Sequence, residues 1–162
     1  MNLILSTCGT SILTNGADED LRKLFAQHAN VRDSGVVPAQ DRSRICAHIE
    51  TRKRQFAQAS HESARRDSAE LNGILSFYGA GSFAENRRDI HYLLATDTLF
   101  GEVTAGIVKG WLDNHGFADV RVERRPDLQT ADCPLFKSAL SDLVKWCAEV
   151  IAPQKTAHCR VV

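Results

Sequence analysis

Two apolar runs that end in small hydroxyl-bearing residues constrain the fold of this chain more than any other feature. Residues 3–5 (LIL) lead into residues 6–11 (STCGTS), and residues 90–95 (IHYLLA) lead into residues 96–98 (TDT). A buried strand followed by such a turn is a common phosphate-binding arrangement in α/β proteins, because glycine admits close approach while N–H groups and hydroxyls donate hydrogen bonds. The repeated pattern predicts two strand ends that share a ligand site.

Helical and extended segments alternate along the rest of the chain. Apolar residues at helical spacing predict helices over about residues 21–28, 41–59, 99–114 and 130–151, with a further helix running to about Tyr78, and strands are predicted over residues 120–123 and 158–162. This alternation predicts an α/β fold of the Rossmann-like, three-layer type, in which helices cover both faces of a parallel sheet. The strand at residues 120–123 alternates valine with charged residues, which is typical of a strand near the sheet edge.

The composition argues against several classes of function. Lys and Arg together number 20, and Asp and Glu together also number 20, so the formal net charge is zero. No overall electrostatic field attracts nucleic acid, and direct nucleic-acid binding is not expected. Five scattered cysteines without a CxxC pair and six histidines without an HxxxH pattern predict neither a disulfide framework nor a metal site, and no motif indicates a cofactor. Without a signal peptide or an apolar segment near the roughly 20 residues that span a bilayer, we expect a cytoplasmic protein with no membrane contact.

The first turn leaves two interpretations open. It matches neither GxGxxG nor GxxxxGK[ST], and both a ligand loop and an ordinary turn stabilised by local hydrogen bonds fit its composition. Cys8 has no arginine shortly after it, as a phosphatase nucleophile would need, and is interpreted as a small packing residue. In the second turn, Thr98 suits a helix cap. Asp97 suits a ribose hydroxyl or an adenine amino group better than a phosphate, since two negative groups repel each other.

Four segments in sequence resemble one known family. They are LSTCGTSILTN at residues 5–15, SAELNGIL at 68–75, LLATDTLFGE at 93–102 and LQTADCPLFKSALSDLVKW at 128–146. They are similar to the CRISPR-associated Rossmann-fold (CARF) proteins, in the branch of the ring nucleases and the sensor domains of type III effector ribonucleases. The resemblance implies a homodimer whose two first loops and two TDT-type loops line one pocket. Its ligand would be cyclic oligoadenylate, the second messenger of type III antiviral defence.

The resemblance also implies roles for individual residues. The positions that match the family's ligand-binding loops are Thr7, Cys8, Gly9, Thr10 and Ser11 in the first loop and Ala95, Thr96, Asp97 and Thr98 in the second. Ser11 matches the serine that orients a ribose 2′-hydroxyl for attack on the neighbouring phosphate, so it is the expected catalytic residue of a metal-independent ring nuclease.

One departure from the family pattern affects cleavage more than binding. Family members continue after a strand like HCRVV into a glycine-rich segment with a lysine, resembling NLTGGFK, whereas this sequence ends at Val162. Residues 1–162 are therefore expected to form one CARF-like domain that is truncated at its C-terminus. The RxxxxH motif of effector ribonucleases is also missing.

Two alternatives to the ring-binding function follow from the sequence. The first is a non-catalytic CARF-like module that dimerises and binds no ring. The second is a nucleic-acid-binding regulator that uses the arginine-rich helix at residues 41–59. A solvated surface is the favoured interpretation of the basic clusters at residues 52–54, 65–66, 87–88 and 124–125, because acidic residues are interspersed and no aromatic residues are interleaved with the clusters.

Overall fold

Four parallel strands form the centre of the structure, a computed structural model that describes residues 1–79, 85–125, 133–153 and 158–161. The strands are β1 (Asn2–Cys8), β2 (Ile90–Thr96), β3 (Asp119–Arg125) and β4 (His158–Val161), and they lie in the order β3-β2-β1-β4. The two strands that carry the hydroxyl turns, β1 and β2, are neighbours in the middle of the sheet.

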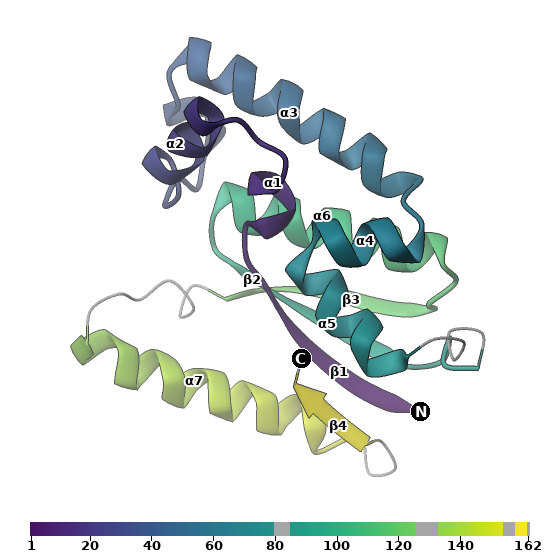
Figure 1. The fold of residues 1–162 in the computed structure, drawn as a ribbon. Helices are drawn as coiled ribbons and strands as arrows, with labels where there is room; N and C mark the ends of the chain where they lie inside the picture. Colours follow the sequence, from purple (N-terminus) through teal and green to yellow (C-terminus); the bar gives the residue numbers. More distant parts are fainter. Residues whose placement is uncertain (80–84, 126–132, 154–157, 162) are drawn as a thin grey trace.

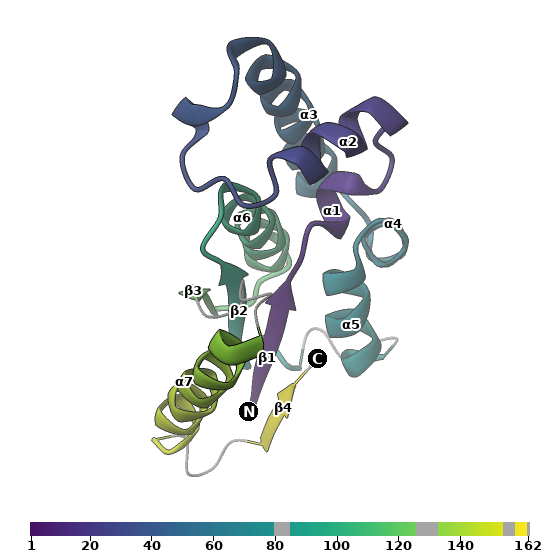
Figure 2. The ribbon, with the colours of Figure 1, turned by 90° about the vertical axis from the view of Figure 1, so that its left-hand side faces the viewer.

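Helices cover both faces of this sheet, which confirms the predicted Rossmann-like α/β fold. The helical elements are α1 (Ser11–Thr14), α2 (Glu19–Gln27), the 3-10 helix η1 (Ser34–Val36), α3 (Ala39–Ala57), α4 (His61–Asp67), α5 (Ala69–Tyr78), α6 (Leu99–Asn114) and α7 (Cys133–Ile151). Helices α5 and α6 lie over one face and α7 lies over the other (Figures 1 and 2). Helix α3 packs on α1, α2 and α6, outside that first layer.

The position of each strand explains its sequence. Strand β2 is a nearly continuous apolar run because it is buried on both faces, between α6 and α7. Strand β3 lies at the edge of the sheet, as its alternating pattern predicted, and several of its side chains are at least partly exposed.

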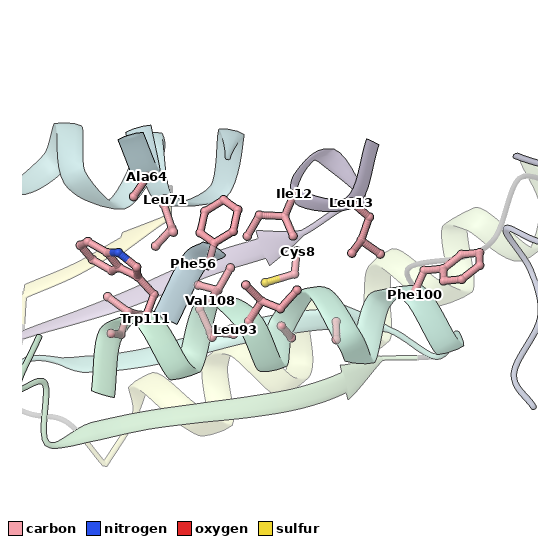
Figure 3. Packing of buried hydrophobic residues seen from close by; sticks show 14 of the residues in the cluster. Cys8, Ile12, Leu13, Phe56, Ala64, Leu71, Leu93, Phe100, Val108 and Trp111 are labelled. Carbon is pink, nitrogen blue, oxygen red and sulfur yellow. The ribbon is translucent and has the colours of Figure 1, made fainter. Parts of the chain in front are cut away.

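The larger hydrophobic core lies between the sheet and the layer of α1, α3, α5 and α6. Figure 3 shows the Cys8 side chain among Ile12, Leu93 and Val108 in the middle of this core, so its interpretation as a packing residue is confirmed. A smaller core on the opposite face joins the apolar side chains of β1 and β2 to α7, where the Trp146 ring meets the Tyr92 ring edge-on at 5.7 Å.

The single helix predicted to run to Tyr78 is wrong, because the chain forms two helices, α4 and α5, with a break at Ser68. Ser68 has an extended backbone (φ −142°, ψ 124°), and its hydroxyl accepts a hydrogen bond from the N–H of Leu71. A serine that caps a helix in this way satisfies a free N–H group of the first turn, and that bond offsets the helical bond lost at the break.

A buried polar network fixes the amino ends of β1 and β2. The carboxylate of Asp89 accepts hydrogen bonds from the Asn2 backbone N–H at 2.6 Å, the Asn2 side-chain amide at 2.8 Å and the Tyr78 hydroxyl at 3.1 Å. The Tyr78 oxygen lies 2.9 Å from Nε2 of His91, which is fully buried. Since the tyrosine proton goes to Asp89, Nε2 of His91 carries the proton that this last contact needs.

Three predictions fall partly outside the described residues. They concern the loop between Tyr78 and β2, the first residues of the helix that became α7, and Val162. In the part of the chain that the structure describes, no helix has the length and apolar character needed to cross a membrane.

Candidate functional site

The two hydroxyl turns lie side by side at the carboxyl edge of the sheet. Strands β1 and β2 pair in parallel, with Cys8 opposite Ala95, so Gly9 and Thr96 both follow at the same edge. The sequence predicted this juxtaposition, and it is the arrangement in which open α/β sheets bind ligands.

The side chains of the first turn divide into exposed and buried groups. Thr7 and Thr10 are exposed and Ser11 is half-buried, so their hydroxyls can face a ligand. The Cys8 thiol is buried, and burial together with the nearby charge of Glu70 raises its pKa far above the ordinary value. Cys8 is therefore held as an unreactive thiol, and it can reach a ligand only through its backbone.

A buried carboxylate on α5 anchors the first turn. Glu70 Oε1 accepts a hydrogen bond from the Gly9 N–H at 3.0 Å, and Oε2 accepts from the hydroxyls of Ser11 at 2.5 Å and Ser68 at 2.8 Å. The Ser11 oxygen in turn accepts from the Ala69 N–H at 3.0 Å. The expected catalytic residue is thus held by α5, a helix that begins more than fifty residues later in the chain.

The second turn is held by close packing and by a helix cap. Thr98 accepts a hydrogen bond from the Gly101 N–H at 3.1 Å and lies 2.9 Å, oxygen to oxygen, from the Thr96 hydroxyl. The predicted cap of α6 by Thr98 is confirmed. Gly101 lies so close to Thr96 that an added Cβ would meet the Thr96 carbonyl oxygen at 2.6 Å. Ala95 is fully buried and offers only its backbone.

Two arginines converge on Asp97 at this edge. Its carboxylate forms ion pairs with Arg124 at 3.0 Å and with Arg32 at 3.4 Å, and Arg124 also lies 3.5 Å from Glu102. Arg32 reaches this edge because its neighbour Val31 is held there: the Val31 carbonyl accepts a hydrogen bond from the Leu99 N–H at 2.8 Å. The site therefore combines exposed hydroxyls with paired, partly exposed guanidinium groups.

Sequence reasoning missed Glu70, Arg32 and Arg124 as parts of this edge. Glu70 lies within the SAELNGIL segment that carried the resemblance, and a carboxylate two residues after a capping serine was the available signal. Arg124 had been interpreted as part of a solvated basic cluster, and no local sequence signal marks Arg32.

The arginine-rich helix uses one of its basic residues for packing. Arg52 on α3 is buried, and its guanidinium donates to the Ile12 carbonyl at 2.7 Å and to the Asp67 carbonyl at 3.4 Å. Burial lowers the pKa of this guanidinium. Arg52 thus ties α3 to α1 and to the end of α4, and its guanidinium is not available to a nucleic acid.

Among the described residues, no group of three or more His, Cys, Asp or Glu side chains could hold a metal ion. The groups at the carboxyl edge are hydroxyls, backbone N–H groups, carboxylates and arginines. They can bind a nucleotide through its phosphates and ribose, and they can orient a hydroxyl, without a bound cation.

Fold and site together define an α/β protein with a parallel sheet and a candidate ligand site at its carboxyl edge. Residues 65–162, more than half of the chain, match the family described as CRISPR-associated protein (Cas_APE2256). The chain belongs to this family of CRISPR-associated proteins. None of the curated proteins matches the chain.

Proposed function

We propose that this protein binds cyclic oligoadenylate as a CARF-type homodimer in the cytoplasm and takes part in type III antiviral defence. The observation that carries the proposal is the pair of hydroxyl turns on neighbouring strands, in a chain of a CRISPR-associated family. One copy supplies one open edge of this kind, and a ring with several equivalent nucleotides suits a pocket built from two identical edges.

The chemistry of the edge fits a cyclic oligonucleotide. Each nucleotide of the ring carries one phosphate and one ribose 2′-hydroxyl. Exposed hydroxyls of Thr7 and Thr10 can donate to phosphate oxygens, and Arg32 and Arg124 add positive charge within reach of the same edge. Asp97 can accept a hydrogen bond from a ribose hydroxyl or an adenine amino group.

The proposal includes cleavage of the ring through Ser11. A ribose 2′-oxygen attacks the neighbouring phosphorus, the bond from phosphorus to the 5′-oxygen breaks, and a 2′,3′-cyclic phosphate and a 5′-hydroxyl result. Ser11 orients the attacking hydroxyl, and no metal is required. A hydroxyl held by a buried carboxylate and a backbone N–H has the fixed geometry that such positioning needs.

Calorimetric titration of the purified protein with cyclic tetra-adenylate and cyclic hexa-adenylate tests binding. We expect a Kd of about 1 μM or lower for one ring size, and one ring per two chains. Light scattering after size exclusion gives the oligomeric state of the same sample. A folded dimer that binds neither ring contradicts the proposal and supports the non-catalytic dimerisation module. Steeply salt-dependent binding of RNA or DNA by that sample supports the nucleic-acid alternative.

Ser11→Ala tests the cleavage step. We expect its single-turnover rate of conversion to linear products to fall by roughly 10²–10³, the usual effect of removing a positioned polar group. Ring affinity should change less than about threefold. Ser43→Ala, an exposed serine on α3, is the matched control and should cleave like the wild type. Equal rates in Ser11→Ala and the wild type would remove Ser11 from the mechanism.

A further inference from the structure

We propose that Glu70 is the positioning residue of the site. Its carboxylate accepts the hydrogen bond that the Ser11 hydroxyl donates, so that Ser11 faces the ligand as a hydrogen-bond acceptor. The inference rests on the proposed function for its ligand, a ring of nucleotides with 2′-hydroxyls. The fixed direction of the Ser11 hydrogen bonds carries it.

The hydrogen bonds of the Ser11 hydroxyl leave one of its two lone pairs unused. A serine hydroxyl has one proton and two lone pairs. The Ala69 N–H can only donate, so it uses one lone pair at 3.0 Å, and the proton goes to Glu70 Oε2 at 2.5 Å. Among the described residues, nothing bonds to the second lone pair. Because the side chain is half-buried rather than enclosed, this lone pair can accept from a ligand.

The surroundings of Glu70 keep the direction of this bond fixed. The carboxylate is buried, and its oxygens receive the Gly9 N–H and the hydroxyls of Ser68 and Ser11. The Ser68 oxygen accepts from the Leu71 N–H at 3.1 Å, so its proton is committed to Glu70 as well. Three donors on an acceptor-only group leave Ser11 no other low-energy orientation.

A hydrogen-bond acceptor at Ser11 favours contact with a ligand group that can donate a hydrogen bond. A phosphate oxygen only accepts, so it gains nothing from Ser11, whereas a ribose 2′-hydroxyl can donate to it. The same contact lies on the path of the reaction. As the 2′-oxygen bonds to phosphorus, its proton passes to Ser11 and the Ser11 proton passes to Glu70. The departing 5′-oxygen takes a proton from water, and the hydroxide that remains takes the proton from Glu70.

Glu70→Gln tests this assignment because it keeps the size of the side chain and reverses the direction of the bond. If the glutamine oxygen keeps the Gly9 N–H, its NH₂ group faces the two serine hydroxyls and donates to them. The Ser11 proton then points elsewhere, and the acceptor is lost. We expect ring affinity within about threefold of the wild type and a cleavage rate lower by about 10². Glu62→Gln, an exposed carboxylate on α4, is the control and should leave both quantities unchanged.

A double-mutant cycle separates positioning from a general loss of structure. If Glu70 acts through Ser11, Glu70→Gln has no further effect on the cleavage rate of Ser11→Ala, and the two effects are strongly non-additive. A second full reduction in the Ser11→Ala background would overturn the proposal. So would wild-type cleavage by folded Glu70→Gln.

A ligand-free measurement keeps this inference distinguishable from the proposed function. Glu70→Ala should speed hydrogen exchange of the Gly9 amide by at least about tenfold, while Glu62→Ala should not, because Glu70 is the acceptor of that N–H within the described part of the chain. Unchanged exchange would overturn the proposal even if the ring binds. A wild type that binds no ring would instead contradict the proposed function, and the exchange result would still decide whether Glu70 holds the turn.

Discussion

A buried carboxylate holds each end of strand β1, and the surroundings of the two carboxylates differ. At the amino end, Asp89 accepts from the backbone and side chain of Asn2 and from the Tyr78 hydroxyl. At the carboxyl end, Glu70 accepts from the Gly9 N–H and from two serine hydroxyls. Counted over the residues that the structure describes, each carboxylate receives three donors, so the two networks are matched in the number of these bonds.

The two networks differ in whether their last group is enclosed in the core or open to the carboxyl edge of the sheet. At the amino end, the network ends in the fully buried ring of His91, so it can serve only the fold. At the carboxyl end, the network ends in Ser11, which is half-buried at an edge lined by exposed threonines and by ion pairs. The same chemical device therefore stabilises the sheet at one end and, in the proposed function, positions the Ser11 hydroxyl at the other.

The largest effect is expected for Gly101→Ala at the carboxyl end. The added methyl group would contact the Thr96 hydroxyl and lie 2.6 Å from the Thr96 carbonyl oxygen, and the backbone cannot move away easily. We expect the free energy of unfolding to fall by about 3 kcal/mol, as measured by urea denaturation.

Gly106→Ala is the matched control on the same helix. Nothing lies within 4 Å of its added Cβ, and alanine is the better helix former, so we expect a gain of up to about 1 kcal/mol. Equal stabilities for the two variants would show that the carboxyl end is not held by the contact between α6 and β2.

Acid should weaken the amino end through His91. Burial lowers the pKa of its ring to about 4 from the ordinary 6.5, so the folded protein keeps this histidine neutral while the unfolded chain takes up a proton. The stabilisation from neutral His91 is complete above pH 6.5 and is lost as the pH falls towards 4. Between pH 7 and pH 5 we expect a loss of about 2 kcal/mol in the free energy of unfolding.

His91→Leu should remove this part of the pH dependence. Burial and the neighbouring His115 also lower the pKa of His61, which acts in the same direction, so the comparison needs the slope of stability against pH in the variant and in the wild type. If the two slopes agree, the folded protein does not hold the pKa of His91 below its value in the unfolded chain.

The smallest change in stability is expected for Asp97→Asn at the carboxyl end. Its partners Arg32 and Arg124 are 64% and 46% exposed, and ion pairs with such exposed arginines contribute little, so the free energy of unfolding should change by less than about 1 kcal/mol. Under the proposed function, release of the two guanidiniums should instead make ring binding more dependent on salt, as measured by titration at several salt concentrations.

Asp113→Asn removes a carboxylate that pairs with Lys109 near the far end of α6, and it serves as the control. Its ring binding should show the wild-type salt dependence. If both variants behave alike, the charges at the carboxyl edge do not reach the ligand.

Much of the fold followed from the sequence because burial leaves a strong local signal. The apolar run of β2, the alternation in β3 and the cap of α6 were all predicted, and the structure confirms them. The break between α4 and α5 was missed because the apolar spacing continues across Ser68. A single hydroxyl that competes for backbone bonds decides that break, and periodicity does not detect it.

The candidate site was predicted less completely. The two turns and their adjacency followed from strand order and glycine placement, whereas the residues that hold them come from other parts of the chain. Glu70, Arg32 and Arg124 reach the site through α5, through the segment after α2 and through the end of β3. Such contacts depend on how the elements pack, and nothing in the local sequence specifies their partners.

The contact between Glu70 and the first turn also joins two stretches of sequence that family comparison separates. The matched region begins at residue 65, so Glu70 lies inside it while Gly9 and Ser11 lie outside. Chimeras that exchange the first 64 residues between relatives should keep the proposed cleavage activity only where a hydroxyl at position 11 is inherited together with the carboxylate at position 70. Substitutions at these two positions should therefore arise together rather than one at a time.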